Sequence, residues 1–362
     1  MASERGQTPR ANAGVSAAAS EARGLTPLAL IAYAGNNVTG TSGVIAIDKV
    51  GNHIRFYDPE TLREIKSFAA PESAAHELAI SHDRGHAFVP LYGDGIYGNN
   101  KTPNNKILVI DLRAQALADI IELGEMTAPH GLVATSDGKL WVVADIPNKL
   151  LVVDPARREV EVAYDCPSRG AHQMALLPDE SKVYVSCKEG DLAVFDRRHR
   201  TWTASVPMRA PGVMSGNGSG SEGVMPAPAG DRLVVIDNDR NDLRVIDTRS
   251  DTEVDRVPLV SCPPSNPKRS RLAKLMFSPD GRCLVATSYA SALAWVIDAA
   301  DLRRQTPVPV AKGPQGMAFP PEGKSVIVAS HDSGLLTRID LAEPRAVAAY
   351  DGGSGIEVLA WY

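Results

Sequence analysis

One unit recurs along most of this chain and limits the folds that it can adopt. The unit is a short apolar strand, a turn of Pro-Asp-Gly character, a strand of β-branched residues, an apolar strand that ends in Asp, and a fourth strand. A clear copy is PHGLVATSDGKLWVVAD followed by KLLVVDPARREVEVAY. The first strands of six copies place equivalent residues 42 to 54 positions apart, at His76, His130, His172, Glu222, Ala273 and Gln315. This spacing is typical of β-propeller blades, which are four-stranded sheets around a central channel.

A seventh copy is split between the two ends of the chain. GIEVLAWY at the C-terminus has the pattern of a first strand and places Ile356 in the column of His76, while VIAIDK, HIRFYD and REIKSF supply the other three strands. Pairing of the two ends would leave no exposed sheet edge. We therefore predict an all-β, seven-bladed β-propeller whose closing blade is shared between the N- and C-termini. It would form a single domain over residues 25–362, after a disordered segment of residues 1–24. A two-layer β-sandwich is the alternative, but it does not explain six four-stranded units.

The turns and strands of these copies resemble those of a known repeat. Pro-Asp-Gly turns followed by VYVS or LWVV strands are similar to the YVTN repeats of bacterial lactonase-like and surface-layer-type seven-bladed propellers. The blade starts PHGL and SEGV also resemble those of streptogramin lyase and of gluconolactonase-like propellers. The resemblance implies the propeller fold, with metal-binding or catalytic side chains at the inner mouth of the channel. It transfers no catalytic residue by identity, because the shared motifs are structural.

Composition and charge exclude several classes of function. The net charge of −5 argues against nucleic acid as a partner, because phosphate binding requires a basic surface. No apolar run has the length of a membrane span, and the N-terminus lacks the apolar stretch of a secretory signal. The four cysteines are few and widely spaced, which does not suggest a disulfide framework. We expect a cytoplasmic monomer that acts on a small molecule and binds neither nucleic acid nor membrane.

The equivalent positions in four consecutive blades hold the residue types that bind metals. His76, His130, His172 and Glu222 occupy this column, although the chain has only 8 histidines in 362 residues. Imidazoles and one carboxylate suit a divalent transition metal such as Zn, Mn, Fe or Cu, whereas calcium prefers oxygen ligands. We predict that these four side chains bind one such metal. The alternative is a ring of polar side chains solvated by water.

Neighbouring positions supply candidates for catalysis and substrate binding. One step along the first strands lie Glu77, Gln173, Lys274 and Glu357, which we expect to point away from the axis because side chains alternate along a strand. Glu77 would then accept a hydrogen bond from a ligand histidine or, alternatively, take part in a hydrogen bond between blades. The ends of the second strands hold Tyr92, Asp145, Lys188, Asp237, Asn238, Tyr289 and His331. Among these, His331 is the predicted acid or base, because histidine titrates near neutral pH; the alternative is a turn histidine held by Asp332.

The predicted substrate-binding residues are Tyr92, Tyr97, Arg169 and Lys188. Arg169 and Lys188 would bind a carboxylate, and Tyr97 would form the wall of a pocket. Tyr97 lies in the first of three insertions, residues 93–105, 209–221 and 261–271, which we expect at the same mouth. The sequence thus favours a metal-dependent enzyme acting on a small carbonyl- or carboxylate-containing molecule, by lactonase-type hydrolysis or by lyase or isomerase chemistry. A non-catalytic ligand- or protein-binding propeller and a metal oxygenase or redox propeller are the alternatives.

Overall fold

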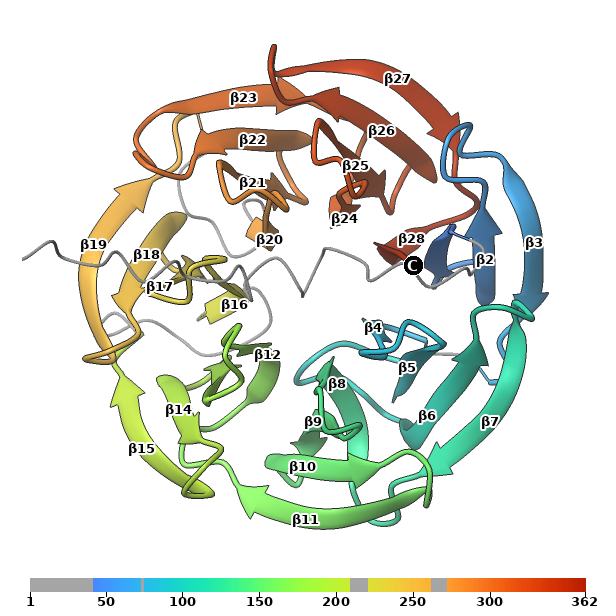
Figure 1. Cartoon of the computed structure of the whole chain (residues 1–362), viewed down its shortest axis with the longest axis vertical. Helices are drawn as coiled ribbons and strands as arrows, with labels where there is room; N and C mark the ends of the chain where they lie inside the picture. Colours follow the sequence, from blue (N-terminus) through green and yellow to red (C-terminus); the bar gives the residue numbers. More distant parts are fainter. Residues whose placement is uncertain (1–41, 73–74, 209–220, 262–271) are drawn as a thin grey trace, which may run out of the picture.

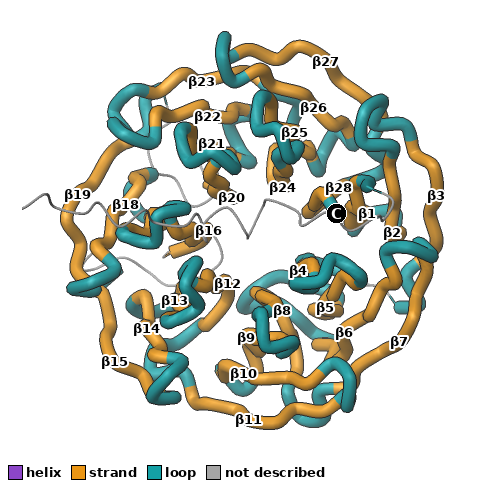
Figure 2. Tube along the Cα trace, viewed as in Figure 1, coloured by secondary structure: helices purple, strands orange, loops and turns teal. Residues whose placement is uncertain are grey.

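The computed structural model describes residues 42–72, 75–208, 221–261 and 272–362, and the strands in these ranges form seven four-stranded antiparallel sheets around one axis (Figure 1). The described residues contain no helix, and hence no helix that could span a membrane (Figure 2). The predicted disordered segment 1–24 and most of the insertions at 209–221 and 261–271 lie outside the described residues. The predicted all-β, seven-bladed propeller is confirmed.

One sheet contains both ends of the described chain. Its strands, in spatial order from the axis outward, are β28 (Ile356–Trp361), β1 (Val44–Asp48), β2 (His53–Tyr57) and β3 (Glu64–Ala69). Strand β28 pairs with β1 from Val44 opposite Trp361 to Asp48 opposite Ile356. The predicted sharing of the closing blade between the two ends is therefore confirmed.

The other six sheets each use four consecutive strands, and the first of the four lies nearest the axis. These strands are β4 (Ala79–Ile80), β5 (His86–Gly93), β6 (Pro103–Asp111) and β7 (Ala116–Glu122); β8 (Thr127–Ala134), β9 (Leu140–Ile146), β10 (Lys149–Asp154) and β11 (Glu159–Asp165); β12 (Ala171–Leu176), β13 (Lys182–Cys187), β14 (Leu192–Asp196) and β15 (Thr201–Val206); β16 (Ser221–Pro226), β17 (Arg232–Asp237), β18 (Asp242–Asp247) and β19 (Thr252–Pro258); β20 (Leu272–Phe277), β21 (Cys283–Ser288), β22 (Leu293–Asp298) and β23 (Gln305–Pro309); β24 (Pro314–Ala318), β25 (Ser325–Ser330), β26 (Leu335–Asp340) and β27 (Arg345–Asp351).

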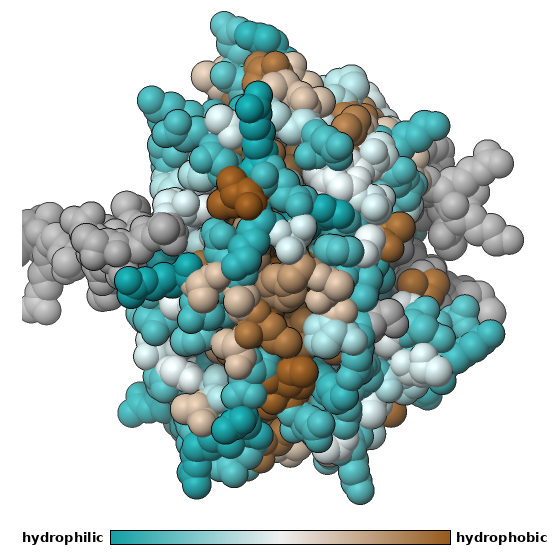
Figure 3. All heavy atoms as spheres, turned by 90° about the vertical axis from the view of Figure 1, so that its right-hand side faces the viewer, coloured by the Kyte–Doolittle hydropathy of each residue, from teal (hydrophilic) through white to brown (hydrophobic). Residues whose placement is uncertain are grey.

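Burial along the strands follows their distance from the axis. Strand β13, the second of its sheet, is buried at every residue after Lys182, whereas the outer strand β11 alternates between exposed and partly buried residues. Second strands are covered on both faces by the adjacent blades and need continuous apolar side chains, while outer strands face water on one side. The side of the molecule that carries β3 shows both hydrophilic and apolar residues at its surface (Figure 3). Ile65 of β3 is one of the exposed apolar residues.

The innermost strands share a β-bulge at the same position. Ala171 of β12 pairs with Cys187, and Gln173 pairs with the adjacent Ser186, so that His172 is an extra residue. Equivalent register shifts occur in β8, β16, β20, β24 and β28. A bulge interrupts the alternation of side chains, so two consecutive residues can face the same side.

The bulge overturns the prediction that Glu77, Gln173 and Lys274 point away from the axis. Gln173 Nε2 donates a hydrogen bond to Glu77 Oε1 over 2.7 Å, and Lys274 Nζ forms an ion pair with the same oxygen. These residues belong to or adjoin β4, β12 and β20, in three sheets that are not neighbours. Their contacts therefore cross the axis.

The alignment of the closing blade also needs a correction. Ile356 is buried and pairs with Asp48, so it corresponds to Ala171 of β12. Glu357 is the extra residue at this bulge. The column of His76 is therefore completed by Glu357 and not by Ile356.

Candidate functional site

Two rings of side chains lie at one end of the inner strands, and we call them together the axial site. The first ring consists of the extra residues at the bulges, with the corresponding residue ahead of β4: His76, His130, His172, Glu222, Ala273, Gln315 and Glu357. The second ring consists of the second-strand residues that directly follow the partner of the residue just before each bulge, or of Ala75 in the blade of β4: Lys49, Tyr92, Asp145, Lys188, Asn238, Tyr289 and His331.

The three histidines of the first ring lie together. The ring centroids of His76 and His130 are 4.5 Å apart in an edge-on arrangement, and those of His130 and His172 are 3.6 Å apart and stacked. Nε2 of His172 lies 3.8 Å from Oε1 of Glu222. The sequence alignment thus placed these four residues correctly on adjacent blades of the same ring.

His130 lies in an environment suited to a metal ligand. Its side chain is only 1% exposed, and neither ring nitrogen makes a hydrogen bond of standard geometry within the described residues. Burial, followed by the positive charges of Lys274, Lys188 and Lys49, holds the pKa of His130 well below its ordinary value. The imidazole is therefore neutral at neutral pH and keeps the lone pair that metal binding requires.

Within the described part of the chain, His76, Glu77 and His130 form a group of possible metal ligands. One atom from each lies within 4.8 Å of the others, and all three residues are buried. Two imidazoles and a carboxylate fit Zn, Mn, Fe or Cu. Glu77 joins this group because the bulge turns it toward the axis.

The side chains of His172 and Glu222 are not directed at a common metal position with His130. The planes of His130 and His172 are stacked and differ by only 28°. Because an imidazole binds a metal in the plane of its ring, these two rings do not point at a common atom in this arrangement. The carboxylate of Glu222 forms an ion pair with Lys188. The geometry therefore favours the group of His76, Glu77 and His130, and the four-residue ligand set stays a prediction.

Three lysines at the axial site each contact a glutamate. Lys188 is fully buried against Glu222, and Lys274 pairs with Glu77. Lys49 Nζ lies 3.7 Å from Glu357 Oε2 and 2.6 Å from Nδ1 of His76. Lys188, a predicted substrate-binding residue, is thus held inside the protein. Lys49 was missed, although it follows the strand VIAID as Lys188 follows VYVSC.

Asp145 forms a buried cluster with Tyr92 and His172. The hydroxyl of Tyr92 donates to Asp145 Oδ2 over 2.6 Å, and His172 Nδ1 lies 3.5 Å from the same oxygen. Burial raises the pKa of Asp145 to about 7, although the hydrogen bond from Tyr92 and the charge of Lys188 act in the opposite direction. Burial and the charge of Asp145 raise the pKa of Tyr92, which therefore stays protonated. Asp145 can exchange a proton near neutral pH.

The other predicted residues lie around this centre. His331 Nε2 is 3.5 Å from Glu357 Oε2, and Glu357 Oε1 is 3.8 Å from Nε2 of His76. Tyr97, from the first insertion, packs edge-on against His172 with ring centroids 5.7 Å apart and donates to Glu189 over 2.9 Å. Arg169 has an 85% exposed side chain 3.6 Å from Glu189. The first insertion therefore lies at the axial site, as predicted.

Replacement of Asp145 by Asn tests its titration. The folded protein holds the proton of Asp145 more tightly than the unfolded chain does, where the pKa is about 3.9. This contribution to stability is fully present below about pH 4 and is lost as the pH rises through about 7. The shift from 3.8 to about 7 corresponds to at most about 4 kcal/mol. Urea unfolding of chelator-treated protein measures this effect. We expect the unfolding free energy of Asp145→Asn to lack the decrease that wild type shows as the pH rises through about 7.

Thr306→Ala, at an exposed residue of the outer strand β23, provides the control because it changes no titratable group, so the pH dependence of the unfolding free energy should remain as in wild type. An Asp145→Asn protein whose stability follows the wild-type pH profile would show that Asp145 does not titrate in this range.

Comparison with known proteins identifies the fold alone. No family model matches the chain, and no curated protein matches it. Solved structures do: a hydrazine synthase of Kuenenia stuttgartiensis (TM-score 0.65, 16% identity, 84% of this chain and 92% of that chain) and a functionally unknown protein of Desulfotomaculum acetoxidans (0.69, 12%, 89% and 99%). A periplasmic gluconolactonase of Pseudomonas aeruginosa is also similar (0.67, 15%, 88% and 98%). At these identities the likeness indicates a shared propeller fold.

Proposed function

We propose that this protein is a metal-dependent hydrolase that opens the ring of a small lactone at the axial site. The observation that carries the proposal is His130, a buried imidazole beside His76 and Glu77 whose two nitrogens make no standard hydrogen bond to the described residues. A buried polar group without a partner is costly, and a bound metal would satisfy it. The likeness to a gluconolactonase supports lactone hydrolysis over lyase or isomerase chemistry.

The residues of the axial site can perform the proton transfers of this reaction. A divalent metal, when bound by His76, Glu77 and His130, would polarise the lactone carbonyl. Water adds to the carbonyl carbon and gives up a proton to His172, whose Nδ1 faces Asp145. The ring carbon–oxygen bond then breaks, and the alkoxide takes up a proton, for which His331 is the proposed donor. The product is a hydroxy acid.

A non-catalytic binding propeller is the second candidate, and one observation favours it. Lys274 forms an ion pair with Glu77, the carboxylate of the proposed metal group. With Lys49 beside Glu357 and Lys188 beside Glu222, the charges of the axial site can balance without a metal. Metal content separates the two functions.

Mass-spectrometric metal analysis of the full chain is the deciding experiment. We expect about one equivalent of a transition metal after purification without chelators. Lactone hydrolysis, followed by acid release across a panel of sugar lactones, should stop on chelation and return with the same metal. A protein that takes up no metal when supplied with Zn, Mn, Fe or Cu would contradict the proposal and leave the binding propeller.

A further inference from the structure

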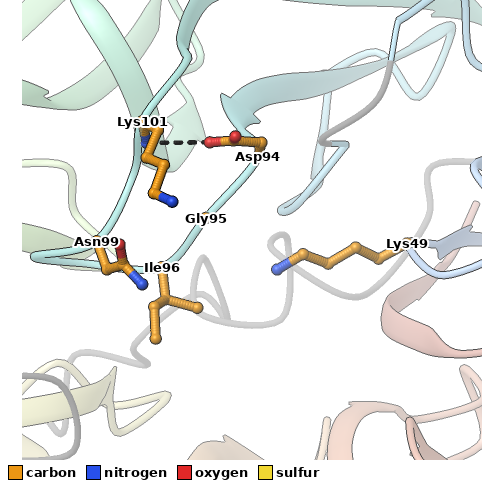
Figure 4. Close-up of a pocket in the computed structure, with 6 residues that line it drawn as sticks. All are labelled: Lys49, Asp94, Gly95, Ile96, Asn99 and Lys101. Carbon is orange, nitrogen blue, oxygen red and sulfur yellow. Dashed lines mark hydrogen bonds between the residues drawn. The ribbon is translucent and has the colours of Figure 1, made fainter.

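A polar cavity of about 370 Å³ lies beside the axial site. It is lined by Lys49, Asp94, Gly95, Ile96, Asn99 and Lys101, of which all but Lys49 come from the insertion between β5 and β6 (Figure 4). Lys49 connects the cavity to the proposed metal group, because its Nζ lies 2.6 Å from Nδ1 of His76. The volume is in the range of small-molecule sites.

The insertion is held in place on several sides. Ile96 and Asn99 exchange two backbone hydrogen bonds of 3.2 and 2.8 Å, and Gly95 lies so close to Asn99 that a Cβ would be 1.9 Å from its carbonyl oxygen. The side chain of Asn100 donates to the carbonyl of Tyr92 over 2.8 Å. Tyr97 is fixed against His172. A wall held in this way loses little conformational freedom on binding.

The side chains that line the cavity carry two positive charges, on Lys49 and Lys101, and the one negative charge of Asp94. Lys49 also lies 3.7 Å from Glu357, so Lys101 is the cation that adds net positive charge. Asp94 Oδ1 accepts hydrogen bonds of 3.0 Å from the backbone amides of Lys101 and Thr102, so its charge stabilises the turn. The ammonium group of Lys101 makes no ion pair within the described residues, and those of Lys49 and Lys101 extend into the same space from opposite sides (Figure 4). The Asn99 side chain adds a polar group, and Ile96, 42% exposed, an apolar wall.

We propose that this cavity binds the carboxylate of a sugar acid, with Lys49 and Lys101 as the charged partners. Ammonium groups form strong, charge-assisted hydrogen bonds to carboxylates. The contact between Lys49 and His76 places the rest of the bound molecule toward the proposed metal group. Resting on the proposed function, this inference names the substrate class as lactones of acidic sugars, or their hydroxy-acid products.

Calorimetry with D-galacturonate and D-galactose tests the site, because these sugars differ by a carboxylate in place of a hydroxymethyl group. In the chelator-treated full chain we expect galacturonate to bind at least about tenfold more tightly. Lys101→Gln should reduce this affinity about tenfold. Lys324→Gln, an exposed lysine before β25 at the opposite end of the strand from His331, should leave it unchanged.

Three results would contradict the proposed carboxylate site. They are no binding of galacturonate at millimolar concentration, equal binding of both sugars, or equal effects of Lys101→Gln and Lys324→Gln. The design separates this inference from the proposed function. If the protein takes up no metal but galacturonate binding depends on Lys101, the hydrolase fails and the carboxylate site stands. If metal and lactone hydrolysis are found but Lys101→Gln binds normally, the carboxylate site alone fails.

Discussion

A chain that lacks residues 356–362 is expected to lose its cooperative fold. The deletion removes β28, the axial strand of the closing blade, and leaves β1 with an unpaired edge. Ile356, Leu359 and Tyr362 are 0%, 2% and 6% exposed, and their burial contributes about 5–9 kcal/mol in total. The net stability of a folded protein is only about 5–15 kcal/mol. We therefore expect aggregation, or the loss of a sharp thermal transition in circular dichroism.

Deletion of residues 1–24 provides the matched control, because the repeat pattern predicts that this segment precedes the propeller. That variant should melt like the full chain. A soluble variant lacking residues 356–362, with an unchanged melting temperature, would show that the closing blade does not stabilise the ring.

The fold could be predicted because its signal is repeated. Each blade needs apolar second and third strands and a turn between its first two strands, and six copies at blade spacing distinguish a propeller from a sandwich. The closing blade followed from the same pattern at both chain ends. Even so, the register predicted for the C-terminal strand β28 was wrong by one residue, because Ile356 was placed where Glu357 lies.

The bulge could not be predicted from alternation. A regular strand would turn Glu77, Gln173 and Lys274 away from His76, His172 and Ala273, whereas one extra residue brings both sets to the axis. Lys49 was predictable from the repeat, because it follows its strand as Lys188 does. No sequence pattern showed that Asp145 would be buried under Tyr92, because this contact joins two blades.

The largest effect on metal binding is expected from His130→Ala. The substitution removes a buried ligand from the proposed group, so metal affinity should fall by more than about a hundredfold, and lactone hydrolysis with it. The fold should persist, because the change also removes two buried nitrogens that make no standard hydrogen bond within the described part of the chain. Metal titration with thermal melting measures both quantities. His82→Ala, which changes an exposed histidine between β4 and β5, is the control and should behave like wild type.

Two further substitutions distinguish the possible ligand sets. If the ligands are His76, Glu77 and His130, Glu77→Gln should lose the metal, whereas His172→Ala should keep it and lose hydrolysis, because His172 would act as the base beside Asp145. If the four-residue set of His76, His130, His172 and Glu222 is correct, His172→Ala should lose the metal, and Glu77→Gln should keep it. Retention of metal by His130→Ala would contradict both sets, since His130 belongs to each of them.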